Sequence, residues 1–126
     1  MERIKIEAKI DFRDNELKIS GKEIRFRHNI SELKENKILF FVRLQIPVSQ
    51  QISNEDFSNV YAVNKLGKIE WQIQNVPPSD HKDYICAPIV GLTIDKKDEL
   101  FVTDFMGRRF QVNQKNGELE KVEMVK

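Results

Sequence analysis

This sequence of 126 residues contains few cysteines and glycines, and its net charge is close to zero. Cys86 is the single cysteine, so no disulfide can form within the chain, and a lone thiol is typical of a reducing cytosol. The five glycines are scattered singly, which excludes a glycine-rich phosphate loop. Lysine and arginine number 21 against 20 aspartates and glutamates, a balance that argues against nucleic acid or an anionic membrane as the main partner.

Long hydrophobic runs are also missing. The apolar runs are short and interrupted by charge, so the sequence predicts neither a transmembrane helix nor a signal peptide. We therefore expect a cytoplasmic protein. Hydrophobic residues make up 40% and charged residues 33% of the chain, which is too apolar and too regularly patterned for a disordered segment. The length suits one domain that covers residues 1–126 and has a single core.

Alternation of apolar and polar residues is the commonest pattern in the chain. From Ile4 to Phe12 every second residue is apolar and the others are charged, as in a strand with one buried face. An N-terminal hairpin is predicted at about 4–20, followed by a strand over 24–30 and a polar turn over 31–36. Further strands are predicted at 38–42, 60–63, 69–73, 89–94, 100–103, 110–112 and 119–122. The chain is therefore predicted to be all-β.

Two segments of the chain repeat one pattern. Val60 to Trp71 and Arg109 to Lys121 both contain a strand, Val-Asn, a polar turn, Gly, a charged residue, an aliphatic residue and Glu. Upstream of each segment, a strand, a charged turn and an apolar strand also recur. The repeat predicts two four-stranded units at about 24–73 and 89–124, with the long loops 49–59 and 75–88 between strands.

Each unit resembles a β-propeller blade of the quinoprotein type, the family that binds pyrroloquinoline quinone. In that family an Ala-x-Asp turn, Thr-Gly-Lys and a Trp recur, and the matching residues are Ala62, Asn64, Gly67, Lys68 and Trp71. Leu66 replaces the family's Thr, and Lys121 replaces the Trp in the second unit. A propeller needs roughly four or more blades. The resemblance thus implies two antiparallel sheets that pack as a sandwich or are completed by oligomerisation, and it implies no cofactor.

Candidate binding residues lie in the second long loop and after a predicted tight turn at Met106-Gly107. They are Asp80, His81, Asp83, Tyr84 and Arg108. A histidine between carboxylates could act as a base or join Cys86 at a metal, but a solvated loop explains the same residues and no second ligand cluster is present. Arg108 and Arg109 could grip an anion, although neighbouring strand residues point to opposite faces.

Two other residues are predicted to serve the fold. His28 is expected to lie on the apolar face of the strand over 24–30 as a hydrogen-bonded core residue. Trp71 alternates with Ile69 and Ile73 and is expected to pack between the sheets.

No recognisable catalytic motif is found in the sequence. We therefore predict a non-catalytic protein-interaction module without a cofactor, which binds a protein partner or further copies of itself. An immunity-type protein that neutralises a toxin is a narrower form of this hypothesis, based on size and fold class. The alternative is a small-ligand-binding or enzymatic domain that uses the loop over 79–86.

Overall fold

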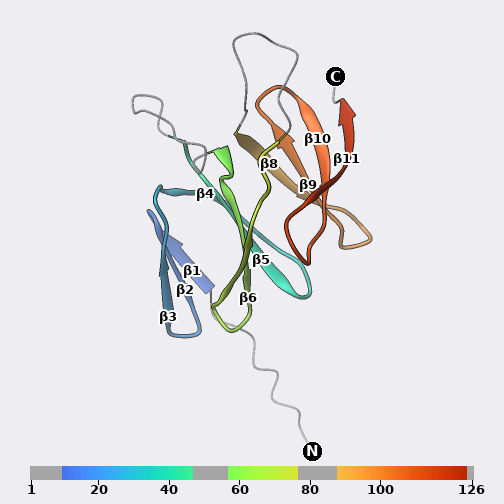
Figure 1. Cartoon of the computed structure of the whole chain (residues 1–126). Coiled ribbons are helices and arrows are strands. Elements are labelled where there is room, and N and C mark those ends of the chain that lie inside the picture. Colours follow the sequence, from blue (N-terminus) through green and yellow to red (C-terminus); the bar gives the residue numbers. More distant parts are fainter. Residues whose placement is uncertain (1–9, 47–56, 77–87, 125–126) are drawn as a thin grey trace, which may run out of the picture.

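The protein is all-β, as the alternation predicted. The computed structural model describes residues 10–46, 57–76 and 88–124, with side chains described as far as Glu120. Eleven strands in these ranges form three antiparallel sheets (Figure 1). In each sheet, strands that follow one another in the chain are hydrogen-bonded neighbours, so each sheet is a simple meander.

The three sheets are named by their order in the chain. The N-terminal sheet contains β1 (Ile10–Arg13), β2 (Glu16–Ile19) and β3 (Lys22–Arg25). The middle sheet contains β4 (Ile30–Glu35), β5 (Leu39–Leu44), β6 (Val60–Asn64) and β7 (Ile69–Gln72). The C-terminal sheet contains β8 (Ile89–Ile94), β9 (Leu100–Asp104), β10 (Arg108–Val112) and β11 (Leu119–Met124).

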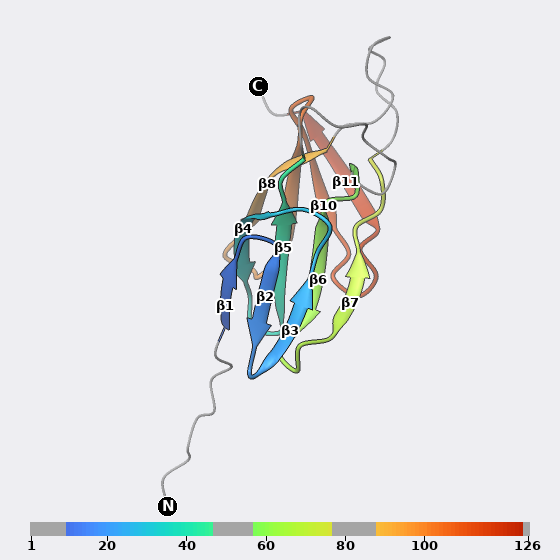
Figure 2. The same cartoon turned by 90° about the vertical axis from the view of Figure 1, so that its left-hand side faces the viewer.

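The middle sheet is covered on both faces. Figure 2 shows the N-terminal sheet in front of it, and the C-terminal sheet packs on its other side. Phe40 and Val42 of β5 belong to the same hydrophobic core as Leu17 of β2. Phe41 lies between them in sequence and belongs to a second core with Phe110 of β10. Adjacent strand residues point to opposite faces, so the continuous apolar run of β5 is explained by burial on both sides.

The predicted repeat corresponds to the middle and C-terminal sheets. The first strand pair of each sheet has a register shift at the same place, at Ile30/Glu32 and at Ile89/Gly91. The last strand pair also has one, at Ala62/Val63 and at Gln111/Val112. The second predicted unit, 89–124, coincides with β8–β11. The two sheets are therefore equivalent in strand order and in local distortion.

Two predictions near the start of the middle sheet are wrong. The expected strand over 24–30 is broken, because β3 ends at Arg25 and the chain crosses to the middle sheet before β4 begins at Ile30. His28 lies half-buried in this crossing and not on a strand face. The polar segment over 31–36 forms β4 and not a turn. The bulge between Ile30 and Glu32 interrupts the alternation, which hides this strand from a pattern of period two.

The N-terminal hairpin does not stand apart from the sheets. It pairs with β3 and forms a third layer, so two predicted sheets become a stack of three. Gly21, Gly67 and Gly117 have φ values of 86°, 83° and 79°, and each stands in the turn before the last strand of its sheet. Among the described residues, the N-terminal sheet therefore has three strands where the other two sheets have four.

Trp71 packs between the middle and C-terminal sheets, as predicted. Its side chain is buried, and its Nε1 donates a hydrogen bond to the carbonyl of Gln114 at 2.8 Å. The ring lies against Gly117, where an added Cβ would sit 2.6 Å from Cε3 of the indole. Asn36 extends this junction, because its Nδ2 donates to the side chain of Gln114. Hydrogen bonds to Gln114 therefore connect the middle sheet to the β10–β11 turn of the C-terminal sheet.

At the opposite end, side chains close the edge of β8 that faces β4. Asn59 is buried, its Nδ2 donates to the carbonyl of Ile89 at 2.8 Å, and its Oδ1 accepts from the amide of Ile89 at 2.8 Å. Glu32 accepts a hydrogen bond from the amide of Leu92 at 3.1 Å and one from Arg43 at 2.8 Å. Backbone groups that would otherwise form an open sheet edge are thus satisfied within the chain.

Replacing Asn59 with alanine is expected to lower the free energy of unfolding by about 2–4 kcal/mol, because it leaves buried backbone groups of Ile89 and Leu44 unpaired. Urea denaturation followed by the fluorescence of Trp71 measures the loss. Asn116→Ala removes an exposed amide and serves as the control. Equal losses in the two variants would contradict the bridging role of Asn59.

Candidate functional site

The predicted binding loop lies mostly outside the described residues. Asp80, His81, Asp83, Tyr84 and Cys86 all fall within 77–87, which the structure does not describe. Arg108 is described and begins β10. The amide of Phe105, in the turn before β10, donates to the carbonyl of Pro88 at 2.9 Å. Arg108 and the end of the predicted loop are therefore at the same end of the C-terminal sheet.

Arg108 neutralises a buried carboxylate. Nε of Arg108 donates to Oδ2 of Asp104 at 2.8 Å, and the amide of Arg108 donates to Oδ1 at 2.9 Å. The side chain of Asp104 is 0% exposed and that of Arg108 is 13% exposed. The guanidinium carbon also lies 5.4 Å from the centre of the Phe110 ring. A buried charge is tolerated only when it is paired, so this contact holds the β9–β10 turn.

Arg109 points to the other face of the sheet, as the alternation of strand residues predicted. Its guanidinium carbon lies 4.1 Å from the centre of the Phe101 ring, a distance typical of a cation–π contact. Arg108 packs beside Phe110, which belongs to the core between the sheets. The two arginines therefore do not form a joint grip on one anion.

The face of the C-terminal sheet that points away from the middle sheet has an unusual composition. The strand register places Thr93, Phe101 and Gln111 in one row, and Thr103 and Arg109 in the next. Val90 and Phe105 lie at the end of this surface and are 44% and 59% exposed. We call these residues the outer C-terminal face: Val90, Thr93, Phe101, Thr103, Phe105, Arg109 and Gln111. On β8–β10 they combine apolar, aromatic and small polar groups with one positive charge, and the register places Lys121 and Glu123 of β11 opposite Gln111 and Arg109.

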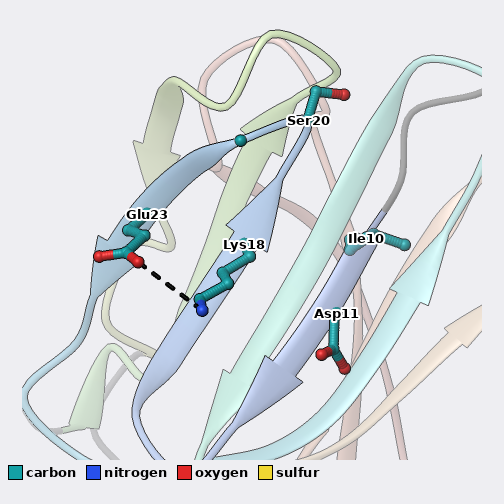
Figure 3. A pocket seen from close by; sticks show the side chains of 6 residues that line it. Ile10, Asp11, Lys18, Ser20 and Glu23 are labelled. Atoms are coloured by element: carbon teal, nitrogen blue, oxygen red, sulfur yellow. Dashed lines mark ion pairs between the residues drawn. The ribbon is translucent and has the colours of Figure 1, made fainter.

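The corresponding face of the N-terminal sheet is a mixture of charges. Its residues alternate in sign along and across the strands, namely Asp11, Arg13, Glu16, Lys18, Glu23 and Arg25. Figure 3 shows a shallow hollow on this face, where Lys18 reaches toward Glu23 at 3.7 Å. Lys18 also lies 3.7 Å from Glu16. Such exposed pairs contribute little energy, and this composition is that of a solvated surface.

Sequence reasoning did not identify the outer C-terminal face. Phe101, Thr103 and Phe105 alternate with the buried Leu100, Val102 and Asp104, so the strand itself was predictable. The signal in the sequence is the pair of phenylalanines on the polar side of an alternating strand. Large aromatic residues at such positions are typical of a binding surface.

The described ranges contain neither a candidate metal cluster nor a helix able to cross a bilayer. In these ranges, no group of three or more His, Cys, Asp or Glu side chains is placed to hold a metal ion. No helix within the same ranges has the length and apolar character to cross a bilayer.

The comparisons with known proteins point to one family. Neither a curated protein nor a solved structure matches the chain. A family model described as "Domain of unknown function (DUF7957)" matches residues 7–124. The matched segment includes all the strands from β1 to β11 that the structure describes. The chain therefore belongs to the DUF7957 family.

Proposed function

We propose that the protein is a non-catalytic protein-interaction module that binds its partner through the outer C-terminal face. The contrast between the two outer surfaces of the stack carries this proposal. The outer face of the N-terminal sheet consists of alternating acidic and basic residues. The outer C-terminal face instead exposes Phe105 and Val90 and contains Arg109. Interface cores are depleted of charged residues and enriched in aromatic residues and arginine, and the β8–β10 part of the second surface has this composition.

The support beneath this face is rigid. Inward-pointing side chains of the same strands, such as Val102 and Phe110, are 0% exposed in the core against the middle sheet. A surface on a packed sheet loses little conformational entropy when it binds, which favours recognition of a folded partner. The strand order of the two larger sheets also supports the propeller-blade interpretation of the repeat. No cofactor, nucleic acid or membrane is part of the proposal.

The segment over 77–87 joins the proposed surface at Pro88, whose carbonyl accepts the amide of Phe105. The predicted binding residues Asp80, His81, Asp83 and Tyr84 precede Pro88 in the sequence and lie outside the described residues. The ligand-binding alternative uses these residues without the face, and it remains a prediction.

Replacing Phe105 with serine is expected to reduce partner binding roughly tenfold or more, because truncating an exposed aromatic residue that anchors an interface causes losses of this size. Tagged wild-type protein, F105S and the control L66S would be purified from cells that naturally produce the protein, and bound proteins would be quantified by mass spectrometry. Leu66 is 73% exposed and lies in the turn between β6 and β7 of the middle sheet. It is therefore an exposed apolar residue outside the outer C-terminal face.

The expected result is a protein recovered in constant ratio with the wild type and L66S but depleted with F105S. Hydrogen exchange of the purified complex should then show protection in β8–β10. Equal recovery with F105S, protection confined to other strands, or the lack of any protein recovered in constant ratio would each contradict the proposal.

A further inference from the structure

β1 is the terminal strand of the N-terminal sheet as the structure describes it. β1 pairs with β2 on one side, and no strand among the described residues pairs with its other side. Figure 2 shows β1 at the margin of the stack. The corresponding edge of β8 is closed by Asn59 and Glu32, so β1 differs from it in being able to accept a strand.

The register of the hairpin identifies the groups on this edge. Arg13 pairs with Glu16 across the turn formed by residues 14 and 15. In such a hairpin the closing pair exchanges backbone hydrogen bonds, and the pairs then alternate between bonded and non-bonded. Asp11 and Arg13 therefore bond to β2, whereas Ile10 and Phe12 direct their amides and carbonyls toward the open edge. Phe12 also exposes 41% of its surface there.

The charges on β1 are arranged to pair with themselves. An antiparallel copy of the strand centred on Phe12 places the two Phe12 residues opposite each other. Asp11 of each copy then lies opposite Arg13 of the other copy, which gives two pairs of opposite charge. Centring the pair on Asp11 would instead place two aspartates face to face, and directly opposed like charges are unfavourable. Of these two registers, the charge pattern therefore favours the one centred on Phe12.

We propose that two copies of the chain associate through their β1 strands, antiparallel and centred on Phe12, so that their N-terminal sheets form one continuous sheet. The pairing gives the amides and carbonyls of Phe12 partners and buries both exposed rings. This inference is independent of the outer C-terminal face, because the N-terminal and C-terminal sheets lie on opposite sides of the middle sheet. A result that contradicts pairing through β1 would therefore not contradict binding through the outer C-terminal face, and the reverse also holds.

Charge reversals at the edge test the pairing and its register. D11R places the introduced arginine opposite Arg13 of the other copy, and R13D places the introduced aspartate opposite Asp11. Each homodimer then has two repulsive pairs, and its dissociation constant is expected to rise roughly tenfold. In an equal mixture of D11R and R13D, every such pair is of opposite charge. We expect the mixture to form a heterodimer about as stable as the wild-type dimer.

Light scattering across a dilution series gives the dissociation constants, and native mass spectrometry distinguishes the heterodimer by its mass. R25D is the control, because Arg25 lies on the same face but on β3, the strand farthest from the edge of β1. Circular dichroism checks that each variant is folded. A wild type that stays monomeric at every concentration would overturn the proposal. So would single reversals that leave the dimer intact, or a mixture that associates no better than its components.

Discussion

Replacing Gly117 with alanine is expected to lower the free energy of unfolding by about 2–5 kcal/mol. Two causes add. The φ of 79° at this position is unfavourable for a residue with a Cβ, and that Cβ would lie 2.6 Å from Cε3 and 2.9 Å from Cδ2 of Trp71. The indole cannot move away easily, because it is buried and its Nε1 is hydrogen-bonded to Gln114. Urea denaturation followed by the fluorescence of the single tryptophan measures the change.

The matched control is Gly21→Ala. Gly21 has a φ of 86°, but an added Cβ there would meet nothing within 4 Å. This variant has the backbone strain without the clash and should lose only about 1–2 kcal/mol. If both variants lost the same free energy, the contact between Trp71 and Gly117 would not limit how closely the middle and C-terminal sheets pack.

Replacing Arg108 with methionine is expected to cost about 3–5 kcal/mol of unfolding free energy, because it leaves the carboxylate of Asp104 buried without its charged partner. Asp104 is 1% exposed, so water cannot easily replace the guanidinium. Arg108 was one of the predicted binding residues, and this variant separates a structural role from a binding role. A residue that only contacted a ligand at the surface would change stability by a few tenths of a kcal/mol.

The double variant D104N/R108M completes the test. The asparagine removes the unpaired charge and keeps an oxygen that can accept the amide of residue 108. We expect the double variant to be more stable than R108M alone. Urea denaturation of the wild type, both single variants and the double variant gives the coupling free energy between the two side chains. Additive losses would mean that the pair makes no joint contribution.

Much of the fold could be predicted from local pattern. The C-terminal sheet follows from short alternating strands and turn residues at Asp95 and Asn116-Gly117, since these signals act within a few residues. β4 was not predicted because it contains many polar residues and because its bulge interrupts the alternation typical of a strand. The third sheet is not evident from the sequence, because the predicted hairpin ends at about residue 20, whereas the turn at Gly21 leads directly into β3. The turns before β7 and β11 contain a glycine with a similar positive φ.

The candidate site was less predictable because it depends on which surfaces the stack leaves uncovered. The alternation around Phe101 shows two faces of a strand but not which face meets another sheet. Asp104 presents the same difficulty. Its sequence neighbours suggest an exposed turn, and only the packing of the C-terminal sheet on the middle sheet makes it buried. Contacts between layers are set by distant parts of the chain, and local periodicity does not encode them.

The two-sided burial of β5 also limits how this family can diverge. Phe40 and Val42 belong to one core, and Phe41 belongs to the other. A change of volume at Phe41 can be compensated by residues of the C-terminal sheet, such as Phe110, but not by its own neighbours in sequence. Substitutions that compensate for changes in β5 should therefore form two separate sets. One set accompanies changes at Phe41, and the other accompanies changes at Phe40 and Val42. The two halves of the stack can evolve independently while sharing a single strand.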